Sequence, residues 1–282
     1  MPMNLAPKTG FALAAMALTT ASPALAQPVP PVTIVPAPTY ADLVALSEGS
    51  ALVLHAVVKD QAVVKPERAP GLAPGHARLY IEAETLALLS GNAPVGQSLR
   101  YLVDVPLDAR GKAPKLKKQQ VLLFARPGRR AGEIQLIDPG AQMLHSTALE
   151  ARIRPVLAQL VARDRPPVVT GIRDALSVAG NLAGESETQL FLETVGGDPV
   201  SVTITRRPGQ APYWGVSWSE IVDQAARPPR PGTLEWYRLA CALPQRLPDQ
   251  ANLTRDSASR ARAAQDYRFV LEQLGPCTRS RG

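Results

Sequence analysis

The sequence predicts an α+β protein that is mostly β, in which a small antiparallel barrel of OB-like type precedes an α+β domain that ends in helices. Three observations favour this fold class. Five short strand-like segments, separated by Gly and Pro, fill the first half of the chain, as is typical of small barrels that are closed or partly open. A second group of alternating segments surrounds a Gly-rich turn. Helical periodicity dominates the C-terminal part.

The first 26 residues predict a cleavable secretory signal peptide. Lys8 precedes an apolar run over residues 11–18, Pro23 ends it, and the small residues of Ala24-Leu25-Ala26 predict cleavage after Ala26. A membrane anchor is the alternative, but a span needs about 20 apolar residues and this run has roughly half of that. We therefore expect a protein exported to the periplasm or the medium, without a membrane span after cleavage.

The barrel-like domain is expected over residues 40–145. A Pro-rich linker, residues 27–39, precedes it and should stay extended. A short helix over 40–47 opens the domain. In the segment 77–85 apolar and polar residues alternate, which predicts a strand with one buried face. The five expected strands cover residues 51–65, 77–85, 99–105, 121–125 and 133–138.

The order of these elements, a leading helix followed by five strands, resembles the barrel of netrin-like and metalloproteinase-inhibitor modules. Those modules carry a cysteine framework, whereas residues 40–145 contain no cysteine. The resemblance therefore implies a layout of elements, and it implies no residue roles.

A helix over residues 146–166 is expected to connect the barrel to the second domain. Thr147 and Glu150 have the spacing of a capping box, and Pro155 predicts a kink or a split. The second domain, residues 167–282, is expected to contain a hairpin of two strands, a third strand and two helices, over residues 188–195, 199–205, 214–218, 234–243 and 257–274.

Two cysteines, Cys241 and Cys277, are the only ones in the chain. In an oxidising compartment two thiols of one chain usually pair. The sequence therefore predicts a disulfide that staples the last helix to the rest of the second domain. Free buried thiols and intermolecular bridges are the alternatives.

No motif specifies an enzyme, a cofactor or a metal. The three histidines, His55, His76 and His145, have no metal-ligand spacing; His55 is expected in the core and the other two at the surface. The segment 184–188 begins like a nucleophile elbow but lacks the closing glycine, so a polar turn is the alternative. We expect no cofactor and no metal, and a non-enzymatic role is favoured.

The positive charge of the chain is concentrated in residues 109–132. The mature chain would carry a net charge of +6, which is the +7 of the full sequence without Lys8. This segment alone carries +8 and no acidic residue, so everything outside it sums to −2. Its basic residues are Arg110, Lys112, Lys115, Lys117, Lys118, Arg126, Arg129 and Arg130.

Such a concentration of charge favours an anionic partner. Lipid A phosphates, an acidic polysaccharide or an acidic protein surface would fit an exported chain, whereas nucleic acid fits less well outside the cytoplasm. The alternative is a solvated hairpin tip that prevents edge strands from pairing. We therefore predict a binding or interaction module with a basic loop. A hydrolase-type enzyme with a site between the domains and a structural envelope protein are the alternative functions.

Overall fold

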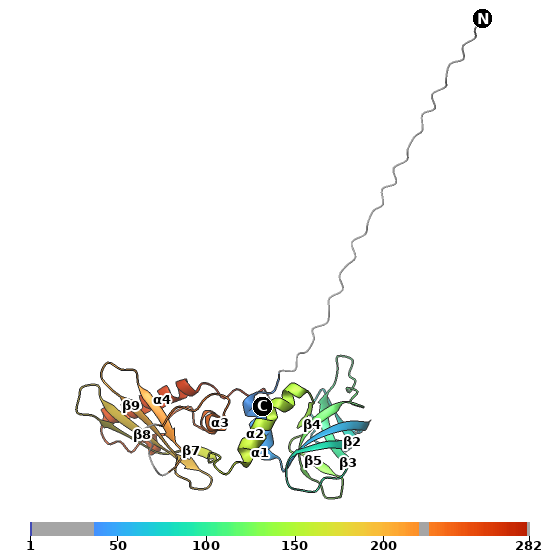
Figure 1. Ribbon diagram of the computed structural model, residues 1–282, viewed down its shortest axis with the longest axis horizontal. Helices are drawn as coiled ribbons and strands as arrows, with labels where there is room; N and C mark the ends of the chain where they lie inside the picture. The colour runs from blue at the N-terminus through green and yellow to red at the C-terminus, as the bar shows by residue number, and fades with distance from the viewer. Residues whose placement is uncertain (2–36, 220–225, 281–282) are drawn as a thin grey trace. The chain divides into compact units, whose positions relative to one another are not determined.

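The computed structural model describes Met1 and residues 37–219 and 226–280 (Figure 1). Apart from Met1, the predicted signal peptide, residues 1–26, lies outside the described residues, as does most of the linker predicted over 27–39. Residues 37–282 form one compact unit. The predicted division into two domains stays a prediction.

The described chain is mostly β, with two antiparallel sheets and helices at its C-terminal end, which confirms the coarse fold class. The first sheet has the strand order β3-β2-β1-β4-β5, and β6 also pairs with β4. In β2, Leu79 and Ile81 are buried whereas Tyr80 and Glu82 are exposed, as the alternation predicts. The strands are β1 Leu52–Val63, β2 His76–Ser90, β3 Ser98–Pro106, β4 Gln120–Pro127, β5 Ile134–Leu136 and β6 Gln142–Leu144.

The first sheet is not a closed barrel. Its edge strands β3 and β5 meet at an isolated parallel bridge, where the backbone N–H of Arg100 donates to the carbonyl of Gly132 at 2.8 Å. A second backbone hydrogen bond, from Asp104 to Pro139, crosses the same edge at 2.7 Å. Because β5 has only three residues, it cannot build a ladder along β3. The closed form of the predicted barrel is therefore wrong, and a seam remains between β3 and β5.

The second sheet has the order β10-β9-β8-β7. Strands β8, Ser186–Thr194, and β9, Ser201–Arg206, form the predicted hairpin, and β10, Tyr213–Ser217, follows as expected. Strand β7, Val169–Ala179, has no counterpart among the predicted strands. Two register shifts interrupt its pairing with β8, so its residues do not alternate regularly along the sequence.

Helices α1, α2 and α3, over Tyr40–Gly49, Thr147–Val161 and Leu234–Ala240, contact one another. One buried hydrophobic cluster includes residues of both sheets and of these helices. The predicted capping box of α2 is wrong: Ser146 is the N-cap, and its hydroxyl accepts from the N–H of Leu149 at 3.1 Å. Because the cap lies one residue earlier than predicted, Glu150 is not at the third helical position, and its carboxylate accepts from His145 and Arg154 instead. The helix also continues through Pro155 without a split.

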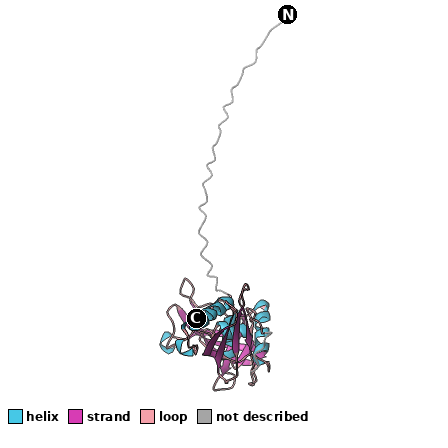
Figure 2. Ribbon diagram, turned by 90° about the vertical axis from the view of Figure 1, so that its left-hand side faces the viewer, coloured by secondary structure: helices cyan, strands magenta, loops and turns pink. Residues whose placement is uncertain are grey.

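Helix α4, Ser257–Leu274, packs on β7 and β8 of the second sheet. Figure 2 shows helices, in cyan, beside strands, in magenta. Its Asp266 is fully buried and accepts hydrogen bonds from Nε of Arg206 at 2.6 Å and from the hydroxyl of Thr188 at 2.5 Å. The sulfur atoms of Cys241 and Cys277 lie 2.05 Å apart, at disulfide distance as expected. A bond between residues 36 positions apart would add about 4 kcal/mol on the chain-entropy account.

Within residues 37–219 and 226–280, no helix combines the length and the hydropathy that crossing a membrane requires.

An ion pair between the buried Arg238 and the partly exposed Glu48 joins α3 to α1. The side chain of Arg238 is only 3% exposed, and its two terminal nitrogens donate to the two carboxylate oxygens of Glu48 at 3.0 and 2.5 Å. Nε of Arg238 donates to the backbone carbonyl of Pro166 at 3.3 Å. A charge withdrawn from water in this way is tolerated only when it is paired and hydrogen-bonded.

The start of α1 is tied to the C-terminal end of the described chain. Asp42 and Thr39 form a capping box, with hydrogen bonds of 2.8 and 3.1 Å. The carboxylate of Asp42 also accepts from the N–H and the hydroxyl of Ser280, at 3.1 and 2.6 Å. Burial raises the pKa of Asp42, but the hydrogen bonds from Ser280 and Thr39 together outweigh it and hold the pKa at about 2.

Replacing Glu48 by alanine should lower the free energy of unfolding by about 3 kcal/mol, because the guanidinium of Arg238 would stay buried without its counter-ion. Urea unfolding followed by tryptophan fluorescence measures the change. Glu67→Ala is the matched control, since Glu67 is exposed and its loss should change stability by less than about 0.5 kcal/mol. Equal stabilities for the two variants would contradict a stabilising role of this ion pair.

Stability should also fall as the pH drops from about 4 to about 2. The pKa of Asp42 is lowered from 3.8 in the unfolded chain to about 2 in the folded one, so its contribution is complete above the unfolded pKa and is lost as the pH falls through the folded pKa. Asp42→Asn should flatten this part of the stability profile, measured by thermal unfolding between pH 2 and 6. The exposed Asp164 provides the control Asp164→Asn, whose profile should match that of the unaltered protein.

Candidate functional site

The structure divides the basic segment 109–132 between the two ends of β4. Five of its basic residues precede the strand and three lie at its far end or in the following turn. The eight residues of β4 span roughly 23 Å at the usual rise of a strand. The segment therefore offers two separate basic groups, Arg110, Lys112, Lys115, Lys117 and Lys118 before β4, and Arg126, Arg129 and Arg130 after its centre.

The first group lies in the β3–β4 loop, which is partly held against β1. Nζ of Lys117 forms an ion pair with Asp60 at 3.1 Å. Lys118 adopts a left-handed conformation, with φ of 68°, and its N–H donates to the carbonyl of Val58 at 2.8 Å. All five basic side chains of this loop belong to exposed residues. They form a charged, solvated surface.

One member of the second group lines a cleft of about 630 Å³ along the seam between β3 and β5. The guanidinium of Arg126 donates to the carbonyl of Gly49 at 3.2 and 3.3 Å, at the end of α1. Arg130 lies 3.9 Å from Glu133. Arg129 lines the cleft itself and is exposed. Of the three arginines in this group, Arg129 therefore contributes its positive charge to the cleft.

Two arginines that line this cleft, Arg100 of β3 and Arg129 of the turn, have no side-chain hydrogen bond or ion pair within residues 37–219 and 226–280. The acidic residue Asp104, by contrast, accepts from Nε and a terminal nitrogen of Arg78 at 2.7 and 2.8 Å. Asp138 accepts from the N–H of Gly140 at 2.8 Å. The third acidic residue of the cleft, Glu133, lies 3.9 Å from Arg130. The cleft therefore presents two arginines without side-chain partners, while each of its three carboxylates has a partner.

The cleft also exposes apolar surface beside these charges. Tyr80 of β2 is 38% exposed and Leu102 of β3 is 48% exposed. Both point away from the buried face of the sheet, which Leu79 and Ile81 occupy. An exposed aromatic ring in the same cleft as two guanidinium groups suits an extended ligand that has both flat, weakly polar faces and negative charges.

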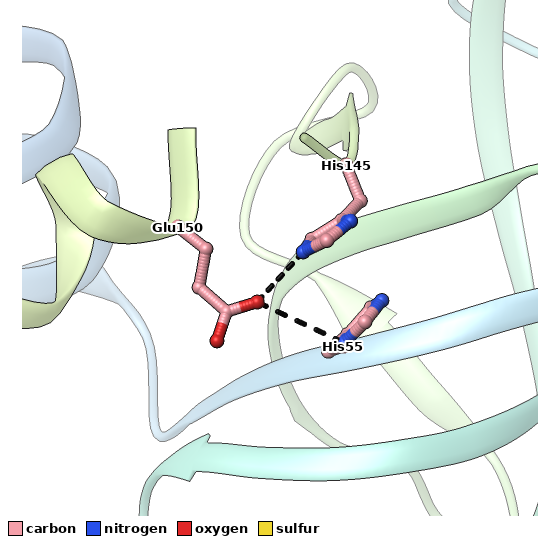
Figure 3. Close-up of side chains that lie close together, drawn as sticks. All are labelled: His55, His145 and Glu150. Carbon is pink, nitrogen blue, oxygen red and sulfur yellow. Dashed lines mark hydrogen bonds and ion pairs between the residues drawn. The ribbon is translucent and has the colours of Figure 1, made fainter. Parts of the chain in front are cut away.

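A second cluster lies where α2 begins against the first sheet (Figure 3). It contains His55 of β1, His145 just after β6, and Glu150 in the first turn of α2. One ligand atom of each residue lies within 4.8 Å of those of the other two. The two imidazole rings are stacked, with centroids 3.9 Å apart and planes 15° apart. The side chains are 14%, 14% and 19% exposed, so the cluster is half-buried.

The two carboxylate oxygens of Glu150 accept hydrogen bonds from different residues. Oε2 accepts from Nε2 of His145 at 2.6 Å and lies 3.9 Å from Nδ1 of His55. Oε1 accepts from the guanidinium of Arg154, whose Nε is 2.9 Å away. The hydrogen bond from His145 and then the one from Arg154 lower the pKa of Glu150 below its usual value. Glu150 therefore faces both imidazoles as a carboxylate.

Sequence spacing does not reveal this cluster. His145, expected at the surface, is instead half-buried, because it directly precedes α2 and lies on His55. His76 stays apart from both, with its Nδ1 3.1 Å from the carbonyl of Pro74. Ser186, in the segment that begins like a nucleophile elbow, is buried in β8. The one local signal was the position of His145 and Glu150 on either side of a helix start.

Neither a protein-family model nor a curated protein sequence matches the chain. The functional inference therefore rests on the geometry of the chain itself.

Proposed function

We propose that this chain is an exported, non-enzymatic binding module that holds an anionic envelope component, such as an acidic polysaccharide, in the cleft between β3 and β5. The observation that carries the proposal is the pair of cleft arginines, Arg100 and Arg129, whose side chains have no partner in the described part of the chain. A guanidinium is a fixed fork of donors that matches a carboxylate, phosphate or sulfate.

The role of the basic β3–β4 loop follows from its distance from the cleft. Its lysines and Arg110 lie beyond the opposite end of β4, so a ligand seated in the cleft would not touch them unless it were long. Their charge would instead raise the potential around this part of the molecule and speed the approach of an anion. The loop thus assists association in this proposal, while the cleft holds the partner.

The proposal includes an OB-like character for the first sheet, as an open variant of that barrel. The support is the strand order together with the parallel approach of β3 to β5. OB folds bind extended ligands on the face of strands two and three and at the loop between strands four and five. The cleft is lined by β2, β3 and the β4–β5 turn, which are the corresponding elements. This likeness supports the position of the ligand in the cleft, whereas the two arginines support its negative charge.

Replacing Arg100 and Arg129 together by glutamate should weaken binding to an immobilised acidic polysaccharide about tenfold or more, since two cation–anion contacts become repulsive. Heparin serves as the probe, and elution in a salt gradient measures the retention. Lys112→Glu/Lys115→Glu is the matched control, because it makes the same change in net charge on exposed residues at the other end of β4.

The comparison of the two double variants decides the location. Strong loss in the cleft variant with modest loss in the loop variant supports the proposal. Equal losses would show that retention follows net charge alone, and a loss confined to the loop variant would place the ligand on the β3–β4 loop; either result overturns the cleft as the binding site.

The proposed location, periplasm or medium, is supported by the predicted signal peptide and by the cysteine pair at disulfide distance, since such bonds are rare in the cytosol. Protein purified from its native source should therefore begin at Gln27 and contain no titratable thiol. N-terminal sequencing and mass spectrometry under non-reducing conditions measure both. A chain that begins at Met1 or Pro2 and is recovered from inside spheroplasts would contradict export.

A further inference from the structure

In the cluster of His55, His145 and Glu150, hydrogen bonds do not account for the close approach of His55 to Glu150. Oε1 of Gln120 can only accept, so Nε2 of His55, 2.9 Å away, donates its hydrogen to it. In the neutral imidazole the other nitrogen, Nδ1, then carries a lone pair. That lone pair lies 3.9 Å from Oε2 of Glu150. With His55 neutral, two electron-rich atoms therefore face each other in a half-buried position.

A positive species between these atoms would remove the repulsion. The proton on Nε2 of His145 satisfies Glu150 in part, through the bond of 2.6 Å, but it does not reach His55. Arg154 contacts only the other oxygen, Oε1. Figure 3 shows both imidazoles beside the same carboxylate oxygen, and Nδ1 or Nε2 of each histidine and this oxygen all lie within 4.8 Å of one another.

We propose that His55, His145 and Glu150 bind one divalent transition-metal ion, with zinc as the best match. Two imidazole nitrogens and one carboxylate form a donor set that zinc favours, whereas calcium and magnesium require mostly oxygen ligands. Three protein ligands leave a fourth position for water, which the partial exposure of all three side chains allows. This inference is independent of the anionic cleft.

The neighbours of the three ligands act as a second shell. Gln120 fixes the ring of His55 with Nδ1 toward the site, and Arg154 holds Glu150 by the oxygen that the metal does not need. Hydrogen bonds of this kind orient ligands and raise metal affinity. The main chain reinforces the arrangement, because the N–H of His145 donates to the carbonyl of Gln120 at 2.9 Å.

Metal binding requires a modest rearrangement. Zinc lies about 2.0–2.2 Å from each nitrogen or oxygen ligand, which places tetrahedral ligand atoms about 3.4 Å apart. The stacked rings must therefore rotate so that their nitrogens converge. Neutral His145 moves its hydrogen from Nε2 to Nδ1 and gives the Nε2 lone pair to the metal, whereas an imidazolium releases one proton on binding.

The test uses the mature chain without an affinity tag, freed of metal with EDTA. Calorimetric titration with zinc chloride should show one ion bound per chain with micromolar affinity or better, and cobalt(II) chloride should give the visible absorption of a four-coordinate ion. His145→Ala should weaken zinc binding more than about a hundredfold, beyond the loss expected for an outer-shell residue, and Gln120→Ala should weaken it about tenfold.

His76→Ala is the matched control, because His76 is the one histidine outside the cluster, and its zinc affinity should equal that of the unaltered chain. Saturation by calcium or magnesium in place of zinc would overturn the assignment, as would the absence of zinc binding. An equal loss in His76→Ala and His145→Ala would do the same. If circular dichroism shows that His145→Ala is unfolded, Glu150→Gln and Gln120→Ala decide: weakened binding supports the site, and unchanged affinity in both overturns it.

Discussion

The guanidinium of Arg238 is buried, and the packing of the helices depends on the groups that accept its hydrogen bonds. Its guanidinium meets the carboxylate of Glu48 at the end of α1 and the carbonyl of Pro166 beyond the end of α2, while its own backbone belongs to α3. Desolvating such a cation costs several kcal/mol unless its donors are occupied. Three segments that are distant in sequence are thus fixed by one side chain, and α1 and α2 in turn contact strands of the first sheet.

Local patterns predicted the elements whose residues face two clearly different environments. The alternation in β2 and the hairpin of β8 and β9 are visible because one face is buried and the other solvated. Strand β7 was missed because two register shifts, one of them beside Arg173 and Asp174, interrupt its pairing with β8. Buried and exposed residues therefore do not alternate regularly along this strand. Counting five strands left a closed and a partly open barrel as alternatives, because closure depends on strand length, and β5 provides only three residues.

The sites were less visible than the fold because they depend on distance through space. Net charge can be counted along a sequence, and the excess in residues 109–132 was found in this way. Arg100, which shares the cleft with Arg129, lies outside that segment and carried no signal of its own. His55 and His145 are far apart in the chain, and only the pairing of β4 with both β1 and β6 brings them together.

The bonds between Asp42 and Ser280 have a further consequence for the order in which the molecule is assembled. The partners are separated by 238 positions, so closing this contact constrains nearly the whole chain, and its entropic cost falls on the folding barrier. During synthesis from the N-terminus, α1 is made long before Ser280 and cannot acquire these bonds until Ser280 has been added. The capping of α1 is therefore completed late, and removing Ser280 would act on a helix near the opposite end of the described residues.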